Sequence, residues 1–303
     1  MADGVGVLDR RANLKGRIAA VVGGAGGILG RAVTLGFAEA GVDVAVLDCD
    51  AAAVEAIVPE VERRRRRALA VAGDALEFAD LARFFEAVAA SYGHLDILVN
   101  LVGGVARASF ADTTREQNQW EIRANFGYVL DSVRLALPLL RKSGRGGSIV
   151  NFTTIEAHRG AATYAVYAGA KAATTNFSRA LAVELAAEGI RVNCLAPDTS
   201  PAQGANAALR PEDFARLREL GADALERAIA FYVPMKRAPS VDDVVNGVLF
   251  LAGDLARSIT GTTLHVDGGT SASLGFLDWP GGDGYMPAPL GGSLRRLFPF
   301  EGD

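Results

Sequence analysis

The chain has 303 residues, of which 50% are hydrophobic and 22% are charged, and these values suit a globular protein with one large or two small α/β domains. The formal net charge of −4 gives no reason to expect a nucleic-acid partner, and no positively charged face is evident in the sequence. No uncharged run reaches the length of about 18 residues that a membrane helix needs, and the N-terminus lacks a secretory pattern, so we expect a cytoplasmic protein without a membrane partner.

Apolar, strand-like runs alternate with helical patterns along the chain. Such alternation predicts right-handed βαβ crossovers, and therefore an α/β fold with three αβα layers around a single doubly wound parallel sheet of about seven strands. Binding sites in these sheets lie at the carboxyl ends of the strands. The predicted strands cover residues 18–23, 43–48, 68–73, 95–101, 147–153, 190–196 and 262–266.

A glycine-rich segment, residues 23–30, follows the first apolar run and leads into a helical pattern. A strand, a glycine turn and a helix N-terminus in this order let backbone amides approach a pyrophosphate closely. About twenty residues further on, the second apolar run ends at Asp48, whose carboxylate can accept hydrogen bonds from ribose hydroxyls and would repel a 2′-phosphate. The segment therefore predicts a dinucleotide site that prefers NAD, although glycines can also serve only to turn the chain.

Tyr167 and Lys171 lie four residues apart in an alanine-rich stretch that predicts a helix. This spacing places a phenol and an ammonium one turn apart on one helical face. A free tyrosine titrates near about 10, and a neighbouring cation lowers this pKa, which makes a usable acid/base pair. The spacing alone is weak, because Tyr-x-x-x-Lys also occurs by chance on exposed helices.

Together these residues resemble the short-chain dehydrogenase/reductase family, from about Leu14 to Gly269. The resemblance implies a Rossmann fold, and it matches Asn100-Leu101-Val102-Gly103 with the family's Asn-Asn-Ala-Gly and Asp74 with the acid near the adenine. It implies cofactor binding by Gly24, Gly27, Ile28, Leu29, Gly30, Asp48, Asp74, Ala75, Asn100, Val102, Gly103, Tyr167, Lys171, Pro197 and Thr199.

The resemblance also implies the roles of four catalytic residues. Tyr167 would be the acid/base, and Lys171 would lower its pKa and hold the nicotinamide ribose. Thr154, which stands where the family has a serine, would donate to the reacting oxygen, and Asn125 would support a proton relay. Val105, Ile155 and Tyr164 are expected to line the substrate pocket.

These implications predict an NAD-dependent oxidoreductase that interconverts a bulky or cyclic, hydrophobic secondary alcohol and its ketone. Arg107 and His158 could contact a negative charge, so an anionic substrate stays an alternative. A 3-oxoacyl-type ketoreductase is an alternative within enzymes, which Asp48 disfavours because it argues against NADPH. A nucleotide-binding sensor or scaffold protein without turnover is the alternative from another class.

The chain departs from the family pattern at four positions. Thr154 carries an extra methyl group, and Ile28 puts a branched side chain where the family has glycine. Leu101 removes an amide that braces the fourth strand, and Asp198 adds a charge near the expected nicotinamide pocket. None of these departures removes the acid/base pair, so we expect an active but divergent member.

We expect an N-terminal extension over residues 1–13, a Rossmann domain over 14–269 with a substrate loop at 198–234, and an aromatic tail over 270–303. The tail is expected to be ordered and to pack near the substrate cleft or across the interface of a homotetramer or homodimer. The two cysteines, Cys49 and Cys194, suggest buried thiols in a reducing compartment, and the three scattered histidines predict no metal.

Overall fold

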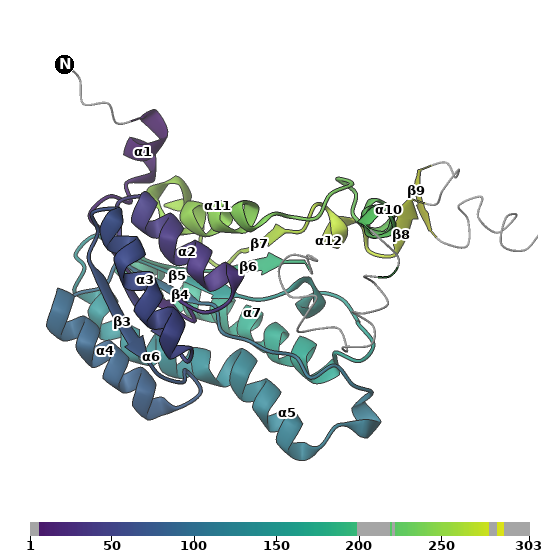
Figure 1. Ribbon diagram of the computed structural model, residues 1–303, viewed down its shortest axis with the longest axis horizontal. Coiled ribbons are helices and arrows are strands. Elements are labelled where there is room, and N and C mark those ends of the chain that lie inside the picture. The colour runs from purple at the N-terminus through teal and green to yellow at the C-terminus, as the bar shows by residue number, and fades with distance from the viewer. Residues whose placement is uncertain (1–5, 199–218, 220–221, 279–283, 288–303) are drawn as a thin grey trace, which may run out of the picture. The chain divides into compact units, whose positions relative to one another are not determined.

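The computed structural model describes residues 6–198, 219, 222–278 and 284–287 (Figure 1). The chain divides into two compact units. The first comprises Met1–Ala196 with Val241–Leu264, and the second comprises Pro197–Ser240 with His265–Asp303. Neither boundary coincides with those expected at residues 14 and 269, and the expected division into domains stays a prediction.

A seven-stranded parallel sheet organises the fold, with the strand order β3-β2-β1-β4-β5-β6-β7. The predicted fold class is therefore confirmed. All residues of β1, β4 and β5 are buried, as expected for central strands that helices cover on both faces. The strands are β1 Ile18–Val22, β2 Asp43–Asp48, β3 Ala68–Ala72, β4 Ile97–Asn100, β5 Gly147–Phe152, β6 Ile190–Pro197 and β7 Thr263–Val266.

Two groups of helices pack on the sheet. Helices α2, α3 and α11 form one group, in which a Cβ atom built on Gly36 of α2 would lie 2.5 Å from Val245 of α11. Helices α4, α6 and α7 contribute to a single apolar core with alternate residues of β1. The helices are α1 Val7–Ala12, α2 Ile28–Glu39, α3 Ala51–Arg63, α4 Phe78–Tyr92, α5 Arg115–Ile122, α6 Tyr128–Arg141, α7 Ala165–Leu185 and α11 Val241–Ala252.

A buried polar network crosses the middle of the sheet. Asn100 at the end of β4 donates to Asn151 of β5 (2.9 Å) and accepts from Ser132 of α6 (2.7 Å). Asn151 in turn donates to Ser178 of α7 (2.9 Å). This network ties β4 to its neighbours, and the backbone amide of Leu101 donates to the last residue of β1 (3.0 Å). The end of β4 is thus braced although Leu101 has no amide side chain.

A π-helical turn, Arg123–Gly127, joins α5 to α6. Turns of this kind are rare and interrupt α-helices mostly at functional sites. This turn carries Asn125, which is fully buried. No helix in the described part of the chain combines the length and the apolar character needed to cross a membrane.

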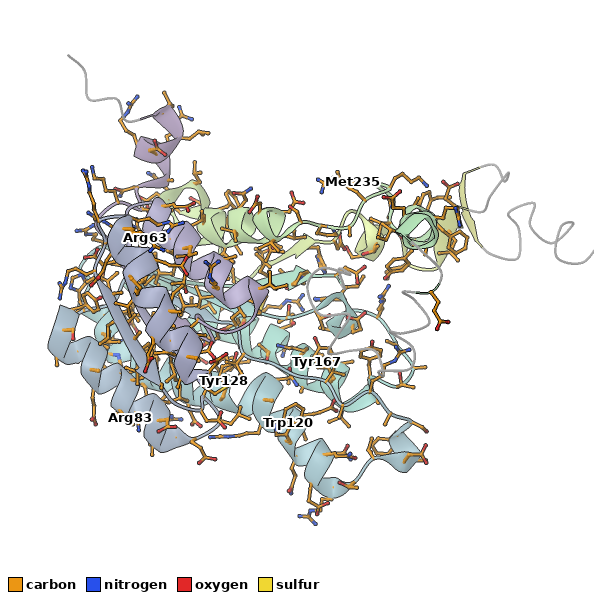
Figure 2. The ribbon with its side chains drawn as sticks, in the orientation of Figure 1. Arg63, Arg83, Trp120, Tyr128, Tyr167 and Met235 are labelled. Carbon is orange, nitrogen blue, oxygen red and sulfur yellow. The ribbon has the colours of Figure 1, made fainter. Side chains whose placement is uncertain are left out.

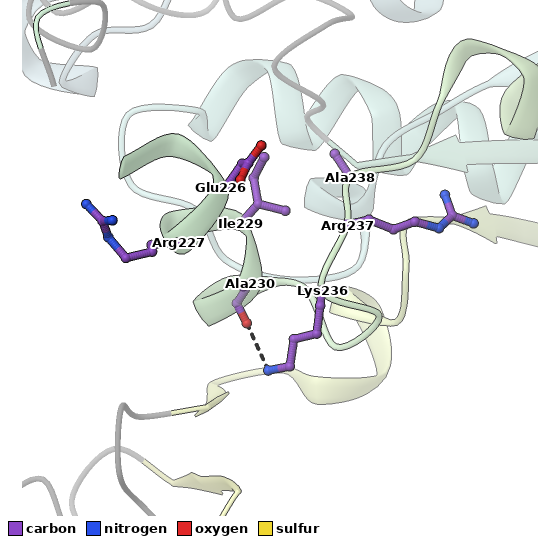
Figure 3. A pocket seen from close by; sticks show the side chains of 7 residues that line it. All are labelled: Glu226, Arg227, Ile229, Ala230, Lys236, Arg237 and Ala238. Atoms are coloured by element: carbon purple, nitrogen blue, oxygen red, sulfur yellow. Dashed lines mark hydrogen bonds between the residues drawn. The ribbon is translucent and has the colours of Figure 1, made fainter. Parts of the chain in front are cut away.

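The second unit contains α10 Ala222–Tyr232, α12 Thr270–Ser273 and a hairpin of β8 Phe276–Asp278 with β9 Tyr285–Pro287. Lys236 connects these parts, because its ammonium donates to Ala230 of α10 (2.9 Å), pairs with Asp278 of β8 and lies 4.8 Å from the centre of the Tyr285 ring of β9. A pocket of about 670 Å³ lies beside α10, where Arg227 and Arg237 extend in opposite directions (Figure 3). The described part of the tail therefore forms structure with the expected substrate loop.

Candidate active site

The glycine turn is built by close contacts that exclude side chains. A Cβ atom on Gly30 would lie 2.0 Å from the carbonyl oxygen of Gly23, and one on Gly24 would lie 2.8 Å from Thr34. Gly27 is the N-cap of α2 and has φ 63°, in the left-handed region that favours glycine. Ile28 is therefore the first residue of the helix, with an ordinary helical backbone and a side chain that is 58% exposed. The branched side chain of Ile28 does not conflict with the turn.

Asp48, the last residue of β2, holds this turn in place. Its Oδ2 accepts from the backbone amides of Ala25 (3.0 Å) and Gly26 (2.7 Å), and its Oδ1 accepts from Asp50 (3.1 Å). A carboxylate has about four acceptor positions. Three are used inside the protein, so about one remains for a ribose hydroxyl.

Other expected cofactor residues lie at the ends of neighbouring strands. Asp74 is exposed after β3, where its carboxylate accepts from the amide of Leu76 (2.9 Å), and Ala75 is buried. Val102 packs against the turn, since a Cβ atom on Gly23 would lie 2.8 Å from its side chain. The side chain of Asn100 belongs to the network inside the sheet and is fully buried.

Gly103 lies where three elements converge. A Cβ atom at this position would lie 2.9 Å from Oδ1 of Asn125 and 3.1 Å from Nζ of Lys171, so the end of β4, the π-helical turn and α7 meet here. The side-chain amide of Asn125 donates to the carbonyl oxygens of Gly104 (2.7 Å) and Glu121 (2.9 Å). Asn125 and Lys171, which sequence reasoning placed in one relay, are thus brought together.

Tyr167 lies on α7 (Figure 2). Lys171 lies on the same helix, as the spacing predicts. Burial raises the pKa of Tyr167 to about 12, a hydrogen bond with Thr154 works in the opposite direction, and the charges of Glu156 and Glu121 add to the rise. The Lys171 ammonium is buried and donates to the carbonyl oxygen of Phe152 (2.9 Å). Burial is the largest influence on the pKa of Tyr167, and the lowering of this pKa by Lys171 stays a prediction.

Burial lowers the pKa of Lys171 from 10.5 to about 8, which makes the stability of the protein depend on pH. The folded state binds this proton less tightly than the unfolded state, so the penalty is complete below about pH 8 and is relieved as the pH rises towards 10.5. Native protein should therefore gain about 3 kcal/mol of unfolding free energy over this range relative to Lys171→Met. Urea unfolding of both proteins at several pH values measures the difference, and a difference that does not change with pH would contradict the assignment.

Thr154 lies directly after β5 and begins a short 3₁₀ turn, Ile155–Ala157. Its hydroxyl donates to Oε2 of Glu156, and Oε1 of Glu156 accepts from Arg159 (2.8 Å). Glu156 is 8% exposed and Glu121, on α5, is 4% exposed. Sequence reasoning missed both carboxylates. The available signal for Glu156 was its position two residues after the expected catalytic hydroxyl.

The three expected substrate residues have different surroundings. Val105 and Tyr164 are partly exposed, and the Tyr164 ring lies 6.1 Å from the Tyr167 ring. The guanidinium of Arg107 lies 5.4 Å from the centre of the Tyr164 ring. Ile155 is fully buried and packs in the interior, and its expected role in lining the pocket stays a prediction.

Pro197 and Asp198 belong to the second unit. Asp198 is buried and accepts a hydrogen bond from Thr270 of α12 (2.7 Å), so its carboxylate is occupied within that unit. Thr199, the remaining expected cofactor residue, lies outside the described residues.

A doubly wound sheet with a glycine turn at α2, an acid at the end of β2 and a tyrosine–lysine pair on α7 defines a dinucleotide-binding protein of the Rossmann class. The family model described as Enoyl-(Acyl carrier protein) reductase matches residues 24–271. The chain belongs to the short-chain dehydrogenase/reductase family of oxidoreductases, which confirms the resemblance seen in the sequence.

Named relatives show the range of this similarity. The chain is 30% identical over 253 residues to the 3-oxoacyl-(acyl-carrier-protein) reductase FabG of Staphylococcus epidermidis, covering 82% of this chain and 97% of that protein. It is 30% identical over 261 residues to the 2,5-dichloro-2,5-cyclohexadiene-1,4-diol dehydrogenase LinX of Sphingobium indicum, covering 86% and 98%. The crystal structure of carveol dehydrogenase from Mycobacterium avium in complex with NAD has a TM-score of 0.76 at 26% identity, covering 84% of this chain and 98% of that chain.

Proposed function

We propose that the protein is an NAD-dependent oxidoreductase that interconverts a secondary alcohol and its ketone, with Tyr167 as the acid/base. One observation carries this proposal: the Thr154 hydroxyl is close enough to Tyr167 to lower the pKa of its phenol, and Lys171 lies one turn further along the same helix beside Gly103 and Asn125. A phenol, a hydroxyl and an ammonium held together in this way can move a proton at an alcohol oxygen.

Each residue has a distinct role in the proposed reaction. In the direction of oxidation Tyr167 takes the proton of the substrate hydroxyl, and in the direction of reduction its phenol donates to the carbonyl oxygen. Thr154 contacts the same oxygen, and Lys171 holds the nicotinamide ribose. The side chain of Asn125 is held at the π-helical turn by its two hydrogen bonds, and it supports the transfer of the proton from Tyr167 towards Lys171. NAD, when bound, supplies the acceptor of the hydride.

The turn at α2 fits a dinucleotide. Gly30 and Gly24 leave no space for a side chain, so the backbone at the N-terminus of α2 is open to a pyrophosphate. Asp48 supplies a carboxylate at the position that favours a ribose diol and repels a phosphate. The NAD bound to the similar carveol dehydrogenase supports this choice of cofactor.

A bulky or cyclic, hydrophobic alcohol is the proposed substrate. Val105 and Tyr164 are partly exposed, and the Tyr164 ring lies near that of Tyr167. Two similar proteins are named as dehydrogenases of a cyclohexadiene diol and of carveol. The FabG relative favours a second candidate, a 3-oxoacyl-type ketoreductase, which the charge of Asp48 disfavours because such an enzyme would need to accept NADPH. The complete set of Tyr167, Lys171 and Asn125 weighs against a sensor without turnover.

Incubation of purified protein with NAD⁺ or NADP⁺ and a panel of cyclic secondary alcohols tests the proposal, with NADH or NADPH absorbance as the readout. We expect turnover with NAD⁺ and at least one cyclic alcohol. Turnover of a 3-oxoacyl thioester with NADPH alone would support the ketoreductase instead. Binding of NADH without turnover of any substrate in either direction would support the sensor.

We further propose that the protein is a cytoplasmic homotetramer or homodimer. Both cysteines are free thiols, which suits a reducing compartment. Cys194 is buried as expected, whereas the expectation of a buried thiol is wrong for Cys49, which is exposed after β2. Trp120 on α5 is 45% exposed (Figure 2). Ile122 on α5 and Val183 on α7 are 48% and 80% exposed, and such apolar side chains on neighbouring helices support an interface between subunits.

A further inference from the structure

The hydroxyl group of Thr154 can donate one hydrogen bond, and Glu156 accepts it. Thr154 donates to Oε2 of Glu156, and the other carboxylate oxygen forms an ion pair with Arg159 at 2.8 Å. Glu156 is 8% exposed, so its carboxylate interacts with these partners in a largely dry environment. Hydrogen bonds to an ionised acceptor are about twice as strong as those between neutral groups. The hydrogen of Thr154 is therefore firmly engaged.

This engagement changes what Thr154 offers to Tyr167. A hydroxyl stabilises a phenolate only by donating to it, and the hydrogen of Thr154 points to Glu156 instead. The Thr154 oxygen still has acceptor capacity, which suits the O–H group of a neutral phenol. The Thr154 hydroxyl lowers the pKa of Tyr167 where it donates to the phenol oxygen, so Glu156 opposes this lowering by accepting the same hydrogen and thereby favours the neutral form of Tyr167.

The other groups around Tyr167 do not compensate for this. Tyr164, at the start of the same helix, and Glu121, from α5, both oppose a negative charge on the phenol. Lys171 is one turn away, but its ammonium donates to the carbonyl oxygen of Phe152. Arg159 is paired with Glu156, and Arg107 lies over the ring of Tyr164.

We propose that Glu156 is a positioning residue that controls the ionisation of Tyr167 through Thr154. By holding the Thr154 hydrogen, Glu156 keeps the phenol neutral and ready to donate a proton to a carbonyl. Formation of the phenolate, which oxidation of an alcohol requires, then needs either a higher pH or a rotation of the Thr154 hydroxyl away from Glu156. The catalytic role of Tyr167 rests on the proposed function, whereas the effect of Glu156 on its ionisation does not.

Two variants of Glu156 separate positioning from simple charge. Glu156→Gln removes the charge and weakens the hydrogen bond that Thr154 donates. Glu156→Asp keeps the charge but shortens the side chain by one methylene group, which moves the carboxylate away from Thr154. We expect both variants to lower the pKa of Tyr167, by about one unit, which means about tenfold more phenolate at a given pH. A purely electrostatic effect of the charge would lower it only in the Gln variant.

The chain contains six tyrosines, so the signal of Tyr167 must be isolated. The absorbance of tyrosinate is measured after a rapid pH jump, before unfolding, for each protein and for the same protein carrying Tyr167→Phe, and the difference gives the titration of Tyr167. The pH profile of alcohol oxidation is a second readout, whose rising limb should move to lower pH in both variants. Because the absorbance titration needs no turnover, it remains decisive if the proposed substrate class is wrong.

Two other acids serve as controls. Glu121→Gln removes a buried charge that faces Tyr167 but bonds to the amide of Ala106 (2.6 Å) and not to Thr154, so it should cause a smaller shift. Glu116→Gln changes an exposed acid on α5 and should cause none. If Glu156→Asp leaves the titration of Tyr167 at its native position, the positioning role is wrong. The Asp variant keeps the ion-pairing charge, so this comparison still decides the proposal if the Gln variant does not fold.

Discussion

Replacing Tyr167 with Phe should abolish turnover and leave the binding of NADH nearly intact. The change removes one oxygen, the group that exchanges a proton with the substrate, and keeps the ring that packs near Tyr164. Loss of a general acid/base costs about 10²–10⁴-fold in rate. Steady-state kinetics and a fluorescence titration with NADH measure the two effects separately.

Matched variants make this result specific. Tyr164→Phe removes a hydroxyl group one turn away. Because Tyr164 is expected only to contact the substrate, this variant should reduce turnover much less than Tyr167→Phe does. Thr154→Ser keeps the hydroxyl and should be tolerated, and Thr154→Ala should slow turnover less than Tyr167→Phe does. If Tyr167→Phe retained a tenth of the native activity, another residue would be the acid/base.

The second large effect concerns Asp48, which should make the protein prefer NAD(H) to NADP(H). Its carboxylate would repel the additional phosphate of NADP, and a change of about 1.4 kcal/mol alters the preference tenfold. Asp48→Ala should therefore narrow or invert the ratio of kcat/KM for the two cofactors. Equal use of both cofactors by the native protein would contradict this role.

Asp48 also holds the glycine turn in place, and this second role affects the interpretation of its variants. Asp48 also accepts from the amides of Ala25 and Gly26, so its truncation releases the turn as well as removing the charge. Asp48→Asn removes the charge and, with its oxygen at the position of Oδ2, keeps the acceptor for both amides, so it should shift the preference with a smaller loss of overall binding. Asp50→Asn is the control, because Asp50 caps α3 by accepting from Ala53 (3.0 Å) and does not contact the turn.

The sheet could be predicted from the sequence because its signal is local. Apolar runs mark the strands, and the observed ends of β1, β2 and β3 lie within a residue of the predicted ones. The glycine turn could also be recognised, although the sequence could not show that the left-handed backbone falls on Gly23 and Gly27. The close approach of Gly30 to Gly23 likewise arises only when the helix packs back on the turn.

The electrostatics of the site could not be predicted from motif spacing. Spacing places Lys171 one turn from Tyr167, but it does not tell how deeply either group is buried, and burial decides the direction of both pKa shifts. The surroundings of Glu156 and the complete burial of Ile155 likewise depend on how the segment after β5 packs. The site residues themselves stay predictions until the variants are measured.

The paired asparagines in the sheet have a consequence for folding. Strands β4 and β5 are buried on both faces, and their apolar residues carry little information about the register between the two strands. Asn100 lies opposite Asn151, and their amides bond to each other in the dry interior. A slip by one residue, about 3.3 Å, would part the two amides and leave them without partners at a cost of about 1–3 kcal/mol each. The pair therefore rejects misaligned sheets during folding, and it sets Gly103 and Thr154, which follow these strands, at matching heights.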